Sequence, residues 1–259
     1  MEKDIHDQVI MDLHGPMRVE SFNKNVWLLT ISDYSTRMVR PYFLKHKNES
    51  FTAFKQYAAY AKQHNPEWKV KHINIYSDDP ENPLKSLRSD GDSCFTEGEF
   101  QEWMLARGIS HEMTTRGSSQ DNPKAETLGR FIQDVARTLM LHANLGGSAW
   151  EEACRAACYL RNRIWHSAIG MTPYEKWFHC KPNLSNLKTW GCVCYRKPPK
   201  EELTRWDDQG LKCLMLGYDD YNPDYYRVYD LTKRAVIRER EIYLSMKNAS
   251  RVGTSHFHM

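Results

Sequence analysis

The chain has 259 residues, of which 41% are hydrophobic, and its 36 basic and 33 acidic residues give a net charge of +3. This length suffices for one large domain or two smaller ones, and so weak a positive charge does not by itself indicate nucleic-acid binding. The sequence contains no run of about 18 apolar residues, so no membrane-spanning helix is expected. The polar start MEKDIHDQ excludes a secretory signal peptide.

The first 64 residues are predicted to form strands followed by a helix. Apolar and β-branched runs predict three strands, at residues 8–13, 26–33 and 38–44. The short polar link YSTR between the last two indicates a hairpin. Residues 48–64 are predicted to be helical because large apolar side chains recur there at three- and four-residue spacing, and Asn48 is the candidate cap.

The middle of the chain alternates strands and helices. Further strands are expected at residues 69–76, 84–90 and 110–115. A helix is expected at 96–109, the longest helix starts near Pro123, and another covers 148–165. This order predicts a mixed α/β domain, with helices packed on a sheet, over residues 1–180.

The pattern changes after about residue 187, where short strands alternate with Gly, Pro and Asp. These strands predict a small β-barrel or meander over residues 187–245, and the tail 246–259 is expected to be disordered. Trp165, Trp177 and Trp190 are interpreted as core or interdomain packing.

Seven cysteines occur at irregular spacings. Their pattern indicates reduced thiols that serve as small core residues of an intracellular protein. A zinc site that includes His142 or His179 is the alternative, although no paired Cys/His spacing supports it.

Three acidic residues stand out by position. Asp12 ends the first strand, Asp90 ends a later strand, and Glu126 opens the longest helix, with 35 residues between the last two. Each has a simpler interpretation: Asp12 could begin a turn, and Glu126 could favour the helix dipole by about 0.3–1 kcal/mol. Asp78 or Asp79, after another strand, could replace Asp90 as a ligand.

This pattern resembles the D,D(35)E triad of retroviral and retrotransposon integrases. The stretches DLHGPM, SDYSTR, LRSDGDSCF, AETLGRFIQDVARTLM, YLRNR and TPYEKWFHCKPNLSNLKTWGC are similar to the integrase region of copia-type LTR retrotransposons. The similarity extends over about residues 9–245. It implies a ribonuclease H-like mixed sheet flanked by helices, followed by a small SH3-like β domain.

The resemblance also implies a chemistry, namely phosphodiester cleavage and strand transfer on DNA. Asp12 and Asp90 would share one Mg²⁺ or Mn²⁺ ion, and Asp12 and Glu126 a second, about 3.5–4 Å away. The implied partner is DNA, with a homo-oligomer as a further expectation and no membrane. The expected location is intracellular and nuclear.

Four basic residues are predicted to contact DNA phosphates, namely Lys124, Arg130, Arg116 and Arg137. For Arg137 a solvated helix face is an equally good interpretation. Arg161 and Arg163, in the stretch YLRNR, could bind the DNA backbone or pair with acidic residues at positions 151 and 152.

The stretches around the second and third acids depart from the family pattern. Asp92 replaces a glycine, Cys94 replaces an acid, and Pro123 and Thr127 replace a glycine and an arginine. The zinc-binding module that precedes such cores does not occur in this sequence, so we expect either a fragment of a larger element or a host-retained copy. These departures favour an alternative function: a remnant that binds nucleic acid or protein without catalysis.

Overall fold

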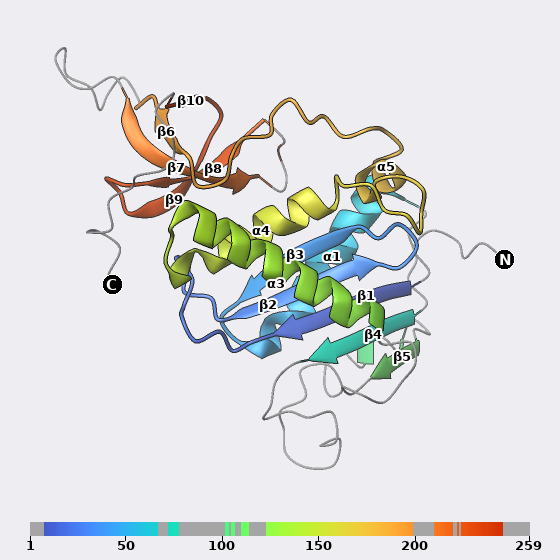
Figure 1. Ribbon diagram of the computed structural model, residues 1–259. Coiled ribbons are helices and arrows are strands. Elements are labelled where there is room, and N and C mark those ends of the chain that lie inside the picture. The colour runs from blue at the N-terminus through green and yellow to red at the C-terminus, as the bar shows by residue number, and fades with distance from the viewer. Residues whose placement is uncertain are drawn as a thin grey trace. The chain divides into compact units, whose positions relative to one another are not determined.

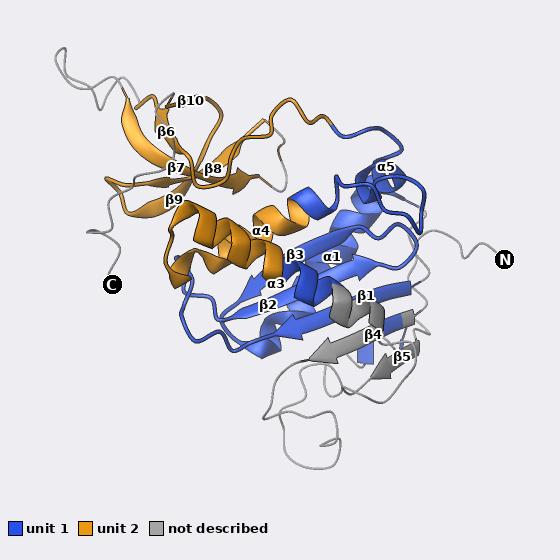
Figure 2. Ribbon diagram, in the orientation of Figure 1, with its two compact units in different colours: residues 1–132, 160–182 blue, residues 133–159, 183–259 orange. Residues whose placement is uncertain are grey.

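The computed structural model (Figure 1) describes residues 8–66, 72–77, 102–103, 105–106, 110–113, 123–198, 210–219, 222 and 224–245. The contacts divide the chain into two units (Figure 2), one of residues 1–132 and 160–182 and the other of residues 133–159 and 183–259. This division groups residues 133–159 with the C-terminal part of the chain, whereas the predicted domain ranges place them in the first domain.

The first unit contains a five-stranded sheet in the order β3-β2-β1-β4-β5. Its strands are β1 (Gln8–His14), β2 (Trp27–Asp33), β3 (Val39–Leu44), β4 (His72–Ser77) and β5 (Ser110–Met113). The central strand β1 pairs antiparallel with β2 and parallel with β4, so the sheet is mixed. The predicted α/β class and the predicted hairpin of β2 and β3 are confirmed.

Alternation along β1 gives the sheet two different faces. Val9, Met11 and Leu13 are at most 1% exposed and join the apolar core formed with α1 (Ser50–His64). The even-numbered residues of β1 face the other way, where the first part of α3 (Pro123–Ala143) crosses the sheet (Figure 1). The sheet of this unit therefore has one apolar face and one face that carries buried polar groups.

The start of α1 differs from the prediction. Asn48 does not cap the helix, because it lies inside a short 3₁₀ turn, Lys47–Glu49. The Glu49 side chain instead accepts a hydrogen bond from the backbone N–H of Lys45 at 2.9 Å. A preceding turn thus takes the place of the predicted side-chain cap.

Helix α4 (Trp150–Arg161) ends before the predicted residue 165. In the first unit, the Asn162 side chain donates a hydrogen bond to the carbonyl of Val39 at 2.8 Å and accepts one from its N–H at 2.9 Å. Asn162 is only 4% exposed. Its amide therefore pairs with the outer edge of β3, as a neighbouring strand would.

Helix α5 (Pro173–Phe178) was not predicted from the sequence. The Thr172 hydroxyl accepts a hydrogen bond from the N–H of Glu175 at 3.0 Å, and Pro173 occupies the first turn. The T-P-x-E pattern is a start signal for such a helix. Trp177 of this helix is 3% exposed and joins the core around α1, which confirms its predicted packing role.

The second unit contains an antiparallel five-stranded sheet in the order β10-β6-β7-β8-β9. Its strands are β6 (Val193–Arg196), β7 (Leu211–Tyr218), β8 (Tyr226–Asp230), β9 (Ala235–Glu239) and β10 (Ile242–Leu244). The predicted small β domain is confirmed, with a register shift between Met215 and Gly217, where φ is +148° at the glycine. The predicted disordered tail lies outside the described residues.

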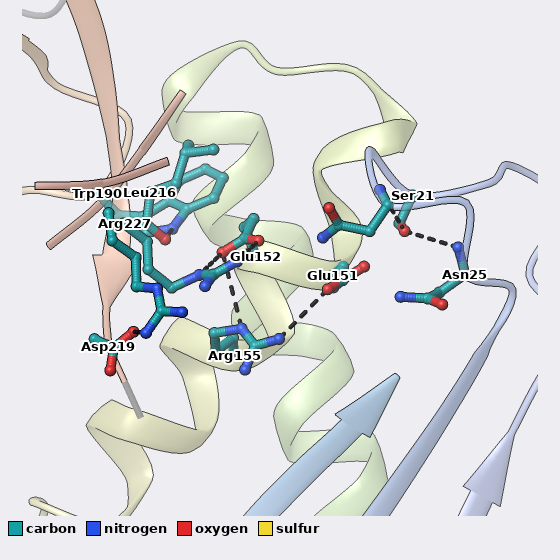
Figure 3. Close-up of polar contacts among 11 residues, drawn as sticks. Ser21, Asn25, Glu151, Glu152, Arg155, Trp190, Leu216, Asp219 and Arg227 are labelled. Atoms are coloured by element: carbon teal, nitrogen blue, oxygen red, sulfur yellow. Dashed lines mark hydrogen bonds and ion pairs between the residues drawn. The ribbon is translucent and has the colours of Figure 1, made fainter. Parts of the chain in front are cut away.

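Ion pairs at the two acids of α4 lie within this second unit. Glu152, whose side chain is fully buried, accepts hydrogen bonds from Arg227 at 2.6 and 2.5 Å (Figure 3). Arg155 lies 3.4 Å from Glu151, the other acid of α4. Glu151 and Glu152, which were considered as partners of Arg161 and Arg163, thus pair with arginines of the second unit.

The cysteines in the described residues are all free thiols. Burial, and then the charge of Glu151, raise the pKa of Cys154 to about 12, and burial is the main cause that raises the pKa of Cys213 to about 11. Such thiols stay protonated and unreactive near neutral pH. The prediction of free cysteines in the core holds for Cys154, Cys158, Cys194 and Cys213, whereas Cys180 is exposed and Cys192 half-buried. Cys94 lies outside the described residues.

Replacing Asn162 with alanine is expected to destabilise the first unit by about 2–4 kcal/mol, because two buried backbone groups of Val39 lose their partners. Thermal and urea unfolding would measure the loss. The exposed Asn183→Ala is the matched control. Equal stability of the two variants would contradict the role assigned to Asn162.

Asp230 is expected to make the second unit sensitive to acid. Burial raises the pKa of Asp230, but hydrogen bonds from the N–H groups of Lys233 and Thr232, together with Arg196 at 2.8 Å, outweigh it and hold the pKa below its usual value. The stabilisation is therefore complete above the unfolded pKa of about 4 and is lost as the pH falls through the lower folded pKa.

Circular dichroism melts between pH 2 and pH 7 would follow this loss. Asp230→Asn should cost about 3–5 kcal/mol at neutral pH, because it removes the carboxylate nearest to the buried Arg196 and leaves the more distant Glu239 at 3.7 Å, and it should flatten the acid dependence. An unchanged acid profile in this variant would show that other carboxylates control the transition.

Candidate active site

The first acid of the predicted triad lies in the middle of the sheet. Asp12 is on β1, opposite Thr30 of β2 and Tyr76 of β4, and is 5% exposed. The Thr30 hydroxyl donates to the backbone carbonyl of Asp12 at 3.4 Å. A central strand bonded on both sides fixes the position of a carboxylate better than a loop would.

His14 lies beside this carboxylate. Its Nε2 is 2.9 Å from Asp12 Oδ2, and its side chain is 6% exposed. The two residues share a face because they are two apart on a strand. Although the atoms are close, Asp12 Oδ2 forms no hydrogen bond of good geometry among the described residues. A buried carboxylate oxygen in this state retains its capacity to bind a cation.

Helix α3 approaches these two side chains through Gly129. A Cβ atom at Gly129 would lie 2.5 Å from His14 Nε2 and 2.7 Å from Asp12 Oδ2. Only a residue without a side chain allows the helix backbone to come so near. Glu126 is three residues earlier in α3, so its backbone lies about one turn from this contact.

The remaining acids of the prediction are not described at the level of side chains. Asp90 lies outside the described residues, as do Asp78 and Asp79 and the strand predicted at 84–90. Glu126 lies in the first turn of α3, where only the backbone is described. The fold brings the helix of the third acid to the strand of the first, and the convergence of the three carboxylates stays a prediction.

The predicted DNA-contacting residues have different outcomes. Arg130 and Arg137 are exposed on α3, and Arg137 pairs with Asp134 at 3.4 Å. Lys124 is in the same helix without a described side chain, and Arg116 lies outside the described residues. Their exposure leaves Arg130 and Arg137 accessible to phosphates, and DNA contact stays a prediction for all four.

The three tryptophans are only partly as predicted. Trp190 is 6% exposed and its indole N–H donates to the carbonyl of Leu216 at 2.6 Å (Figure 3), which confirms a packing role. Trp165 is 64% exposed, so the prediction that it packs in a core is wrong. The chain leaves helical structure at Asn162, and Trp165 therefore falls in a surface turn.

Sequence reasoning missed His14 and Gly129 as parts of the site. The signal for His14 was the alternation in Asp12-Leu13-His14, which places the acid and the imidazole on one face of a strand. Gly129 had no comparable signal, because a lone glycine in a helix does not reveal which strand it meets.

The described part of the site fits a hard divalent cation at Asp12. The residue offers a buried carboxylate oxygen, the type of ligand that Mg²⁺ and Mn²⁺ prefer. Within the residues whose side chains are described, no group of three His, Cys, Asp or Glu forms a complete metal site. Also among the described residues, no helix is long and apolar enough to cross a membrane.

Comparison with known families gives matches over both parts of the chain. Residues 192–248 match the family of retroviral polymerase SH3-like domains. The chain is 33% identical over 240 residues, 92% of its length, to a retrovirus-related Pol polyprotein from transposon TNT 1-94 of Nicotiana tabacum. It is 30% identical over 144 residues, 54% of its length, to the corresponding polyprotein from transposon RE1 of Arabidopsis thaliana.

Solved structures give a weaker likeness. The catalytic core domain of HTLV-2 integrase in complex with magnesium aligns with 67% of this chain and 98% of its own at a TM-score of 0.44 and 18% identity.

The SH3-like match confirms the predicted SH3-like part, and the polyprotein matches confirm the predicted resemblance to retrotransposon Pol sequences. The chain spans only 17% and 10% of the lengths of these two polyproteins.

The close contact at Gly129 predicts that a glycine-to-alanine substitution there has an unusual effect on stability. Gly→Ala inside a helix ordinarily stabilises by about 1 kcal/mol. Gly129→Ala should instead destabilise the protein by about 1–3 kcal/mol, because its methyl group would overlap His14 and Asp12.

Urea unfolding followed by circular dichroism would measure the change. The exposed Thr138→Ala, on the same helix, is the control and should be close to neutral. A Gly129→Ala protein as stable as this control would rule out the close approach of α3 to β1.

Proposed function

We propose that the chain is the integrase part of a copia-type retrotransposon polyprotein and that it cleaves and joins DNA phosphodiesters. The observation that carries the proposal is the buried Asp12 carboxylate under Gly129 of α3. This geometry brings the first acid of the predicted triad to the helix of the third acid. The similarity to a transposon polyprotein over 92% of the chain supports the same function.

Three carboxylates would hold the metal ions that this reaction needs. Asp12 and Asp90 would bind one Mg²⁺ or Mn²⁺ and Asp12 and Glu126 a second, and such ions activate an attacking oxygen and stabilise a leaving one. Asp12 is suited to a shared position because it lies on the central strand with one oxygen lacking a hydrogen-bond partner among the described residues.

The protein itself would hold the Asp12 carboxylate in place and keep water away from it. Hydrogen bonds to β2 and β4 fix the backbone of Asp12, and the α3 backbone at Gly129 covers it. His14, whose Nε2 lies 2.9 Å from Asp12 Oδ2, would limit the rotation of the carboxylate. A water molecule or a DNA 3′-hydroxyl would be the nucleophile, held in line with the phosphodiester that it attacks.

DNA is the proposed partner. The exposed Arg130 and Arg137, together with Lys124 and Arg116, would contact phosphates and hold the strand by charge. A homo-oligomer would bring two DNA ends together. Action on chromosomal DNA places the proposed activity in the nucleus.

A second candidate is a DNA-binding remnant without catalysis. The stretch after Asp90 favours it, because Asp92 adds a negative charge and Cys94 replaces a carboxylate of the family pattern. A second charge so near would disfavour the ionised form of Asp90. The two candidates differ in one property, the dependence of product formation on metal.

Asp12→Asn is expected to lower DNA nicking and joining by at least about 100-fold, because the amide removes a negative charge where metal binding is needed. The assay uses a labelled DNA duplex with Mg²⁺ or Mn²⁺ and follows product strands on a denaturing gel. Asp90→Asn should have the same effect.

Asp224→Asn is the matched control, because Asp224 is exposed in the second unit and should leave product formation unchanged. If both triad variants still formed product in a metal-dependent way, the assignment of Asp12 and Asp90 as catalytic acids would be refuted. Salt-sensitive DNA binding by the unaltered protein without any product would favour the remnant.

A further inference from the structure

A cavity of about 540 Å³ lies on the polar face of the sheet in the first unit. Ile10 of β1 and Ser32 of β2, which are register partners, line it together with Leu128 and Phe131 of α3. The turn at residues 161–168 completes the lining. Its volume falls within the range of about 300–1,000 Å³ that is typical of small-molecule sites.

Two arginines line this cavity. Arg37 follows the β2–β3 turn with φ of 62°, and its Nε is buried without a hydrogen-bond partner among the described residues. The Arg161 guanidinium lies 5.6 Å from the centre of the Phe131 ring. In the described parts of the chain, no carboxylate lies within ion-pair distance of either arginine. A negative charge at this position is therefore not supplied by the described residues.

The two guanidinium groups carry like charges and line the same cavity. Burial, and then the charge of Arg37, lower the pKa of Arg161. Burial and the charges of Arg161 and Arg37 likewise lower the pKa of His166, which also lines the cavity. An anion bound between Arg37 and Arg161 would relieve this repulsion.

Apolar side chains surround the charged part of the cavity. Trp165 is 64% exposed, Ile164 52% and Phe131 37%. Exposed aromatic surface beside half-buried cations suits a ligand with an anionic group and a flat ring system. A nucleobase offers such a flat surface, and stacking on aromatic side chains contributes about 1–3 kcal/mol per base.

We propose that this cavity binds a nucleotide through its terminal phosphate, with the base against Trp165. A phosphate monoester carries a charge of about −2 at neutral pH, which matches two arginines better than a single carboxylate does. Arg37 and Arg161 would hold the phosphate, and the hydroxyls of Ser32 and Ser167 could add hydrogen bonds.

This binding needs neither the metal ions nor the cleavage proposed above, so either idea can fail alone. Two ligands share the required chemistry, a free nucleoside monophosphate and the 5′-phosphorylated end of a DNA strand. Both present a terminal phosphate attached to a nucleoside, and they differ in whether a strand continues beyond it.

Isothermal titration calorimetry without divalent metal tests the proposal on the full chain. The probes are AMP, adenosine, and a short single-stranded oligonucleotide with either a 5′-phosphate or a 5′-hydroxyl. We expect the phosphorylated member of at least one pair to bind at least 10-fold more tightly than its partner, because it alone carries the dianion.

Three variants locate the binding. Arg161→Gln should weaken binding of the phosphorylated probe at least 10-fold, and Trp165→Ala, at an exposed position that tolerates change, should weaken it about 5-fold or more. Arg18→Gln removes an exposed arginine of the same unit and should have no effect. Circular dichroism melts check that the variants fold.

AMP binding with this pattern of variants supports a free nucleotide as the ligand. The same pattern with the phosphorylated strand alone supports a DNA end. The proposal is overturned if no probe binds, if adenosine and the 5′-hydroxyl strand bind as tightly as their phosphorylated partners, or if the folded Trp165→Ala protein binds as tightly as the Arg18→Gln control.

Discussion

Helix α3 can lie against β1 only because residue 129 has no side chain. A methyl group there would overlap both His14 and Asp12, so the glycine fixes the distance between the helix and the strand. The same approach covers the Asp12 carboxylate and limits its contact with water. Burial without a full set of hydrogen bonds is unfavourable for an ionised carboxylate. The first unit therefore retains an arrangement that a bound cation would stabilise.

The polar face of the same sheet holds groups of opposite charge. Asp12 and Ile10 are two apart on β1, and Ile10 lines the cavity that contains Arg37 and Arg161. Asn162 fixes the start of the 161–168 turn, because its amide binds the edge of β3 at Val39. The Asp12 carboxylate and the cavity with its two guanidinium groups thus lie on the same face of the sheet, one suited to a cation and the other to an anion.

Local sequence patterns predicted most of the strands and helices. Apolar residues at every second position in a strand, or three to four residues apart in a helix, reflect the burial of one face of that element. They failed where distant residues decide the structure. Helix α4 ends early because Asn162 pairs with Val39, 123 residues away in sequence. Because the helix ends there, Trp165 lies on the surface, although its large aromatic side chain suggested burial in a core. In the site, the spacing identified Asp12 and the helix of Glu126, but the contact of Gly129 with His14 depends on packing that no local pattern contains.

The second unit is held by charges that depend on one another. Glu152 has no exposed side-chain surface, and Arg227 occupies both of its oxygens. Arg196 and Asp230 form a second pair that is at most 2% exposed. Removing one partner would leave a buried charge with only a more distant counter-charge, which is destabilising. Burial raises the pKa of the Cys154 and Cys213 thiols, so they stay protonated near neutral pH and add packing rather than cross-links. The buried ion pairs therefore join separate elements of this unit, because Glu152 links α4 to β8 and Arg196 links β6 to β8.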